Sequence, residues 1–217
     1  MKSARPAVIF DFNGTLSDDE PILLAIFTEL FDSDLGWSMT PDEYYAEMLG
    51  LSDRDIVQRA VRRCDARPEI VGELLHRRHV MYTDRVAVAN PITPATAELV
   101  TSLADKEFPL AIVTGAQRAD VTAVLDASPI AGLFDVMITE EDVDRGKPDP
   151  QGFLMAAEQL DCAPASILVF EDSAPGVTGA LAAGMHCIAV SAEPGAALRA
   201  VAPAIVAALS TDLLTAV

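Results

Sequence analysis

Four short segments of this 217-residue sequence combine carboxylates, hydroxyls, glycines and a lysine. They are residues 11–16 (DFNGTL), 114–115 (TG), 146–150 (GKPDP) and 171–173 (EDS). Asp11, Glu171 and Asp172 would supply clustered oxygen ligands, and such carboxylates repel one another unless a divalent cation lies between them. Each segment alone is weak evidence, because a carboxylate at the end of a strand is often only a helix cap.

The same segments contain groups that suit the oxygen atoms of an anion. Lys147 is a cation, and the Thr114 hydroxyl beside Gly115 can donate a hydrogen bond. Gly14 and Thr15 allow a tight turn whose amides can face a phosphate. A metal ion, a carboxylate nucleophile and a cation are together what phosphoryl transfer through an acyl phosphate needs. We therefore predict that the four segments form one phosphoryl-transfer site.

Short apolar runs that end at polar residues position these segments. The runs are 8–10, 110–113, 134–138, 167–170 and 187–190, and their continuous apolar character is typical of strands buried on both faces. Helical patterns lie between the later runs, over 119–127, 152–160 and 176–183. This alternation predicts an α/β fold with a Rossmann-like, doubly wound parallel sheet. Polar residues at the strand ends would then meet at the ligand-binding edge of the sheet.

Residues 17–91 interrupt this alternation with helical patterns only. Helical spacing of apolar residues runs through 21–31, 55–63 and 69–82. Thr40, Pro41 and Glu43 have the order of a helix start with a capping box. We predict an inserted α-helical cap domain over 17–91 and a catalytic core formed by 1–16 and 92–217.

The order and spacing of the motifs resemble the haloacid dehalogenase-like hydrolase superfamily, in its subclass with a helical cap after the first motif. Residues 9–20 (IFDFNGTLSDDE) resemble motif one, and 112–115 (IVTG) resemble motif two. Residues 145–150 (RGKPDP) are similar to motif three, and 169–173 (VFEDS) with the following helix are similar to motif four. Phosphatases of phosphoglycolate and sugar phosphates, and hexose-phosphate mutases, are the relatives that this resemblance implies.

The resemblance implies a role for each residue of the site. Asp11 would be the catalytic nucleophile that forms an aspartyl-phosphate, and Thr114 and Lys147 would hold the phosphoryl oxygens. Asp172, with Glu171 beside it, would bind Mg²⁺ together with Asp11 and the backbone carbonyl of residue 13. The implied function is a Mg²⁺-dependent phosphatase that hydrolyses a small phosphorylated metabolite.

Asn13 departs from the D-x-D pattern of this family. In the phosphatases the second Asp protonates the leaving oxygen and then activates water, and an amide can do neither. Losing a positioned acid/base typically costs roughly 10²–10⁴ in rate. We therefore expect a slow phosphatase, one with a substitute acid, or one that prefers good leaving groups. The alternative is a catalytically silent relative that binds a phosphorylated ligand, and deamidation at Asn13-Gly14 would restore an acid.

Members of the superfamily with other activities have other residues at position 13, and residues elsewhere in this sequence favour or disfavour each activity. Dehalogenases have Tyr there and need no metal, which fits poorly with Glu171 and Asp172. Phosphonate hydrolases use a cap lysine, whereas the lysines of this chain are Lys2, Lys106 and Lys147. Sugar-phosphate mutases use a cap histidine soon after motif one, but the histidines here are His76, His79 and His186. The interpretation as a mutase-like phosphotransferase is therefore less favoured, but it remains an alternative.

The cap residues 49–54 (LGLSDR) resemble the loop that faces the active site. Arg54 is the candidate to bind a second anionic group of the substrate, and an ion pair with Asp53 or Glu47 is the alternative. Weaker basic candidates are expected to be solvated. These are Arg77, Arg78, Arg118, and the pair His76 and His79, which lacks a third metal ligand nearby.

The acidic composition of the chain restricts the classes of ligand that it is expected to bind. The chain has 33 Asp and Glu against 15 Lys and Arg, a net charge of −18, which disfavours nucleic acid and anionic membranes. A metal between the carboxylates then becomes a condition for binding a small phosphate. No apolar run approaches a membrane span or a signal peptide. Three widely spaced cysteines also suggest a reducing compartment. We expect a cytoplasmic monomer or dimer.

Overall fold

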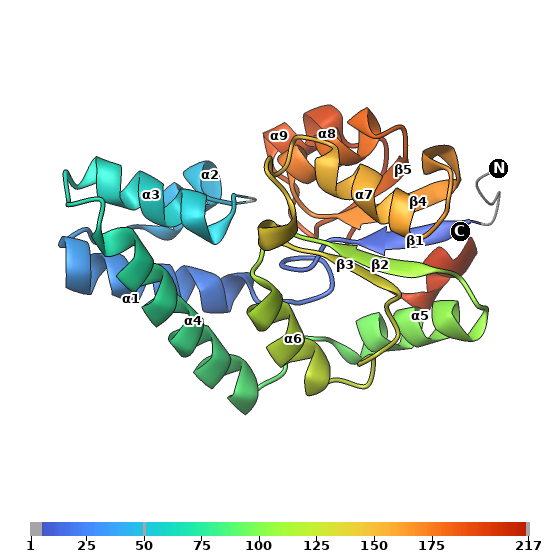
Figure 1. The fold of residues 1–217 in the computed structure, drawn as a ribbon, viewed down its shortest axis with the longest axis horizontal. Helices are drawn as coiled ribbons and strands as arrows, with labels where there is room; N and C mark the ends of the chain where they lie inside the picture. The colour runs from blue at the N-terminus through green and yellow to red at the C-terminus, as the bar shows by residue number, and fades with distance from the viewer. Residues whose placement is uncertain (1–5, 50, 216–217) are drawn as a thin grey trace.

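The computed structural model describes residues 6–49 and 51–215. A six-stranded parallel sheet with the order β3-β2-β1-β4-β5-β6 lies at its centre (Figure 1). The strands are β1 (Ala7–Phe10), β2 (Leu110–Val113), β3 (Val136–Ile138), β4 (Ile167–Glu171), β5 (His186–Val190) and β6 (Ile205–Val206). The predicted strands are confirmed, and β3 begins two residues later than its apolar run suggested. The short edge strand β6 was not predicted.

Side chains alternate across the sheet and build an apolar core on each face. Ala7 and Ile9 of β1 join one buried cluster, while Val8 and Phe10 join the other. Helices α7 (Gln151–Gln159), α8 (Ala174–Ala182) and α9 (Ala196–Val201) cover the first face (Figure 1). Helices α5 (Pro94–Asp105) and α6 (Arg118–Asp126) cover the second. Both faces are therefore buried, which confirms the doubly wound α/β fold.

Helices fill the connection between β1 and β2, as predicted. They are α1 (Glu20–Leu35), α2 (Pro41–Glu47), α3 (Asp53–Arg63), α4 (Ile70–Val88) and then α5. The predicted capping box at the start of α2 is present, since the Thr40 side chain accepts from Glu43 N and the Glu43 carboxylate accepts from Thr40 N. Helix α5 was not predicted, and the Thr93 hydroxyl caps it by accepting from Thr96 N at 3.1 Å.

Helices α1 to α4 extend from one end of the sheet (Figure 1). Their buried side chains, such as Phe27 and Leu74, belong to the same continuous apolar cluster as Phe10 of the sheet. Packing therefore joins the helical region to the core, and the division into domains at residues 16 and 92 stays a prediction. No helix in the described part of the chain combines the length and the apolar character needed to span a bilayer.

Candidate active site

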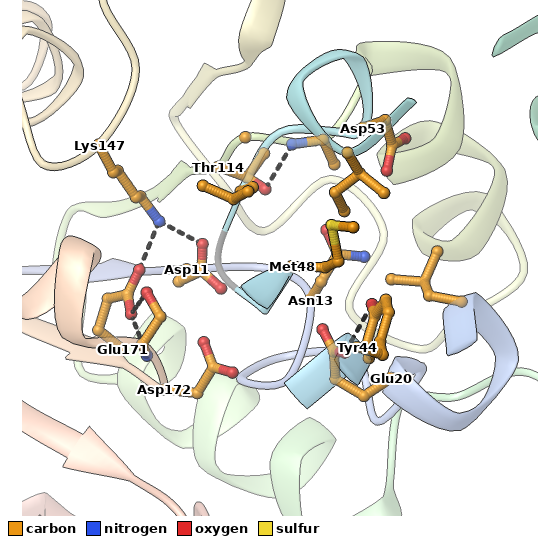
Figure 2. Close-up of a pocket in the computed structure, with 16 residues that line it drawn as sticks. Asp11, Asn13, Glu20, Tyr44, Met48, Asp53, Thr114, Lys147, Glu171 and Asp172 are labelled. Atoms are coloured by element: carbon orange, nitrogen blue, oxygen red, sulfur yellow. Dashed lines mark hydrogen bonds and ion pairs between the residues drawn. The ribbon is translucent and has the colours of Figure 1, made fainter. Parts of the chain in front are cut away.

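The carboxyl ends of three neighbouring strands bring the predicted site together. Asp11 follows β1, Thr114 follows β2, and Glu171 ends β4 with Asp172 next to it. Because β1 lies between β2 and β4, these side chains face one pocket, which Lys147 also lines (Figure 2). The parallel register thus produces the convergence that the strand ends predicted.

Asp11, Glu171 and Asp172 form a cluster of carboxylates. One oxygen of each lies within 4.8 Å of the others, and Asp11 and Glu171 are buried. Burial raises the pKa of Asp11 to about 7, with Lys147 opposing the shift and Glu171 adding to it. Burial and the charges of Glu171 and Asp11 raise the pKa of Asp172 well above its usual value. An all-oxygen donor set whose charges repel fits a hard divalent cation such as Mg²⁺.

Lys147 bridges two of these carboxylates (Figure 2). Its Nζ donates to Asp11 Oδ1, and to Glu171 Oε1 at 2.6 Å. The side chain is 12% exposed. Burial alone would lower the pKa of its ammonium, but the charges of Asp11 and Glu171 outweigh burial and raise it. Lys147 therefore stays cationic at the point where Asp11 would meet a phosphoryl group.

The start of α8 holds Glu171 in place. Glu171 Oε2 accepts from Ser173 N at 2.6 Å and from Ser173 Oγ at 2.9 Å. The same hydroxyl accepts from Gly176 N at 3.1 Å and so caps α8. A Cβ on Gly176 would lie 1.7 Å from Glu171 Oε1, so only glycine leaves room for this carboxylate.

The turn after β1 brings the backbone against Asp172. Gly14 has φ +75°, and a Cβ there would lie 2.3 Å from Asp172 Oδ2. Its amide donates to Ser17 O at 2.8 Å, and the Thr15 amide donates to Phe12 O at 3.2 Å. Both amides are thus used within the turn, and their role as phosphate donors stays a prediction. What Gly14 provides here is the close approach of the turn to Asp172.

Thr114 and Gly115 line the pocket on the side of β2. Thr114 is buried, and its Oγ1 accepts from Ala116 N at 3.0 Å, so the hydroxyl proton can be donated elsewhere. A Cβ on Gly115 would lie 3.7 Å from Ser52 Cα. This is an ordinary van der Waals distance, so the cap loop lies close to the strand end and leaves room for a Cβ at position 115.

Asn13 lines the pocket and contacts a buried acid behind it. Its Nδ2 donates to Asp19 Oδ2 at 2.8 Å, and the same oxygen accepts from Tyr82 Oη. Asp19 is fully buried, and burial raises its pKa despite these hydrogen bonds. An amide suits this position, because an aspartate would place a second carboxylate against Asp19.

Glu20, Tyr44 and Asp53 line the cap side of the pocket (Figure 2). Asp53 lies in the loop 49–54 that was expected to face the active site, whereas Glu20 and Tyr44 were not predicted. Tyr44 Oη donates to Glu20 Oε2 at 3.0 Å. Burial and the charge of Asp19 raise the pKa of Glu20 to about 7. Along the sequence, residues 18–20 (DDE) look only like the acidic start of a helix, so no local signal marks Glu20 as a pocket residue.

The basic candidates of the cap have separate locations. Arg54 Nε lies 3.3 Å from Glu140 Oε1 of the core, so its ion pair is with neither Asp53 nor Glu47. Its side chain is 57% exposed and lines a neighbouring recess with Ser52. Gly50 of the same loop lies outside the described residues. The role of Arg54 in substrate binding stays a prediction.

The prediction that Arg78 is solvated is wrong. Arg78 is 1% exposed, contacts Asp120 of α6, and has Nε 3.0 Å from Asp53 Oδ2. His79 also contacts Asp120, through Nδ1. Only the packing of α4 against α3 and α6 creates this buried network, so the sequence of α4 alone could not reveal it. Arg77, on the same helix, is 42% exposed and pairs with Asp34.

Comparisons with known proteins identify the family of the chain. Residues 8–190 match the haloacid dehalogenase-like hydrolases. The chain belongs to this family. It is 30% identical over 185 residues to the phosphorylated carbohydrates phosphatase of Thermotoga maritima, covering 84% of this chain and 83% of that protein. It is also 30% identical over 190 residues to hexitol phosphatase A of Escherichia coli, covering 85% and 82% of the two chains.

Solved structures of other proteins share the fold. The structure of CbbY from Rhodobacter sphaeroides in complex with phosphate has a TM-score of 0.83 and 25% identity, covering 96% of both chains. A mutant of that CbbY with Asp replaced by Asn, in complex with xylulose-1,5-bisphosphate, has the same TM-score and 26% identity. These similarities show that the helical region after β1 also occurs in relatives that bind phosphate ligands.

Proposed function

We propose that this haloacid dehalogenase-like protein is a Mg²⁺-dependent phosphatase that hydrolyses a small phosphorylated metabolite through an aspartyl-phosphate on Asp11. The observation that carries the proposal is the contact of Lys147 with Asp11 and Glu171, next to Asp172. It puts a nucleophile, a cation and an oxygen donor set in one pocket. The phosphatase names of the Thermotoga maritima and Escherichia coli relatives support a sugar or sugar-alcohol phosphate as substrate.

The donor set fits the metal that the family implies. Asp11, Glu171 and Asp172 would hold Mg²⁺ together with the backbone carbonyl of Asn13. When bound, the ion offsets the negative charge of these carboxylates and of the phosphoryl oxygens. The raised pKa values of Asp11 and Asp172 support this assignment, because burial and the neighbouring carboxylates disfavour the ionised forms that a bound cation would stabilise.

The residues of the chain account for the bond changes. An Asp11 oxygen attacks phosphorus, so that a P–O bond to Asp11 forms while the ester P–O bond breaks. Lys147 and the Thr114 hydroxyl bind the phosphoryl oxygens during this transfer. The leaving oxygen takes up a proton. Water then attacks the phosphorus, which releases phosphate, restores the Asp11 carboxylate and gives up a proton.

Asn13 cannot supply or accept the protons of these steps. Its amide also donates a hydrogen bond to Asp19, so the orientation of the Asn13 side chain is fixed by the protein and not by a substrate. This contact favours the second candidate function, a silent relative that binds a phosphorylated ligand without turnover. A phosphatase with Asn13 would be slow and would work best on esters with good leaving groups.

A phosphate-release screen tests the proposal. The substrates are p-nitrophenyl phosphate, hexose and hexitol phosphates, phosphoglycolate and nucleoside monophosphates, each with Mg²⁺ and with a chelator. We expect Mg²⁺-dependent release that Asp11→Asn abolishes. Asp18→Asn, an exposed acid of the same segment, is the matched control and should retain activity. Release that survives Asp11→Asn would overturn the site assignment, and binding without release would favour the silent relative.

A further inference from the structure

The pocket has different charges at its two ends. Lys147 lies beside Asp11 at the end where a phosphoryl group would bind, and Glu20 and Asp53 lie at the cap end (Figure 2). Among the described residues that line the pocket, Lys147 is the only lysine or arginine. It is already bonded to Asp11 and Glu171. Its charge therefore serves the phosphoryl end and does not compensate the cap end.

Glu20 faces the pocket without a cation beside it. Within residues 6–49 and 51–215 it forms no ion pair, and its Oε2 accepts from the neutral Tyr44 hydroxyl at 3.0 Å. Asp19, next to it, is fully buried and adds negative charge. Burial and this neighbouring charge raise the pKa of Glu20 to about 7, so both disfavour its ionised form.

Asp53 shares its cation with a second carboxylate. It is 6% exposed, and its Oδ2 forms an ion pair with Arg78 Nε at 3.0 Å. Arg78 shares its charge with Asp120 of α6. Burial raises the pKa of Asp53 to about 6, with Arg78 opposing the shift and Asp120 adding to it.

Arg54 does not make up this deficit. Its guanidinium pairs with Glu140, and it is absent from the residues that line this pocket. The remaining cap lining is apolar or neutral, and consists of Leu23, Tyr44, Met48, Leu51 and Ile56. A second anionic group on a ligand would therefore meet Glu20 and Asp53 at the cap end, while Arg78, which is shared by Asp53 and Asp120, does not line the pocket.

We infer that the substrate of this pocket is a phosphomonoester whose organic part carries a positively charged amine, and that the cap end rejects esters with a second anionic group. This inference rests on the proposed phosphatase function. An ammonium group near Glu20 and Asp53 gains Coulomb energy in a partly desolvated pocket, and a carboxylate there loses a similar amount. Hydrogen bonds from the amine to Glu20 would fix the orientation of the ester relative to Asp11.

A series of phosphate esters that differ only in charge tests the inference. The series consists of ω-amino-, ω-hydroxy- and ω-carboxyalkyl phosphates with two to four carbons. Their kcat/KM values are measured with Mg²⁺, and their inhibition constants are measured against p-nitrophenyl phosphate. We expect the best amino ester to exceed the best hydroxy ester by about tenfold, and the hydroxy ester to exceed the carboxy ester by about as much.

Variants show whether the acids cause this order. Glu20→Gln should reduce the amino-to-carboxy ratio about tenfold, and Asp53→Asn should reduce it as well. Glu73→Gln removes the same charge from an exposed position on α4 and should leave the ratio unchanged. Each readout is a ratio of two kcat/KM values for the same variant, so a lower concentration of folded protein changes both values equally and leaves the ratio unchanged.

The outcomes separate this inference from the proposed function. Absence of release from all esters, including p-nitrophenyl phosphate, would refute hydrolysis, and calorimetric binding of the same series would still rank the three charges. Amino and hydroxy esters of equal rank would overturn the preference for an amine. A carboxy ester that ranks equal to or above the hydroxy ester would overturn the inference altogether.

Discussion

Asn13 places an amide between the pocket and the buried Asp19. The amide donates to Asp19 at 2.8 Å, whereas the family pattern has an acid at this position. Chemistry and stability therefore make opposite demands on residue 13. An amide satisfies the buried carboxylate, while an acid would serve proton transfer.

Asn13→Asp should raise phosphate release from alkyl phosphates by about 10²-fold or more, because it supplies a proton to the leaving oxygen and then a base for water. Initial rates at saturating Mg²⁺ check this. The gain should be smaller for p-nitrophenyl phosphate, whose leaving group needs little protonation. Asn13→Ala is the control, since it frees Asp19 without adding an acid. An equal gain in Asn13→Ala would show that breaking the Asn13–Asp19 hydrogen bond, and not acid catalysis, causes the faster release of phosphate.

The elements position the site through two kinds of close contact. Short turns bring backbone against carboxylates, as Gly14 does at Asp172. Buried ion pairs join helices, as Arg78 of α4 joins Asp53 of α3 and Asp120 of α6. In each contact the residue type is required by its position in the fold: a glycine for the close approach and an arginine for the buried ion pairs.

Gly14→Ala should weaken Mg²⁺ binding, because an added Cβ would collide with Asp172 and because alanine is strained at φ +75°. The measurement is the increase in melting temperature on adding Mg²⁺, which should become smaller than in the native protein. Gly72→Ala on α4 is the matched control, since a Cβ there meets nothing within 4 Å. That change should stabilise the protein by roughly 0.5–1 kcal/mol. An unchanged Mg²⁺ response in Gly14→Ala would contradict the proposed role of Asp172.

Arg78→Met should lower the free energy of unfolding by about 3–5 kcal/mol, because it leaves Asp53 and Asp120 buried without their cation. Urea unfolding measures this. Arg77→Met, one residue earlier on a half-exposed side chain, should cost less than about 1 kcal/mol. Adding Asp120→Asn to Arg78→Met should recover part of the loss. Equal losses for the two single variants would show that the buried network is not a stabilising feature.

Across the whole molecule, the net charge of −18 is distributed unevenly. Several carboxylates with raised pKa values surround one pocket, including Asp11, Glu20 and Asp53. Each of them binds a proton more tightly in the folded chain than in the unfolded chain. Protonation therefore stabilises the fold, and ionisation costs stability.

This gives a pH dependence with a defined sign. The pKa of Asp11 rises from 3.8 to about 7 on folding, so its contribution is complete below pH 3.8 and is lost as the pH rises through 7. When a chelator is present, the melting temperature should decrease as the pH rises from 5 to 8. Mg²⁺ should raise it more at pH 8, where the carboxylates are ionised, than at pH 5. Asp11→Asn should flatten both trends, and an Mg²⁺ effect that is independent of pH would contradict the carboxylate site.

The sequence by itself determined the sheet, the helical region after β1 and most of the phosphoryl end of the pocket. Buried parallel strands are continuous apolar runs, and each ends at a residue whose chemistry is visible locally, as at Asp11, Thr114 and Glu171. Capping at Thr40 was predictable for the same reason, because all its partners lie within one turn.

Only the tertiary structure decided the cap end of the pocket. Glu20 and Asp53 are far apart in the chain, and their shared pocket depends on how α1 and α3 pack together beyond the end of the sheet. Arg78 shows the same limit, since its spacing on α4 does not distinguish a solvated arginine from a buried one. Charges interact through space, so their partners, and with them the expected charge of the substrate, follow from packing and not from the order of residues.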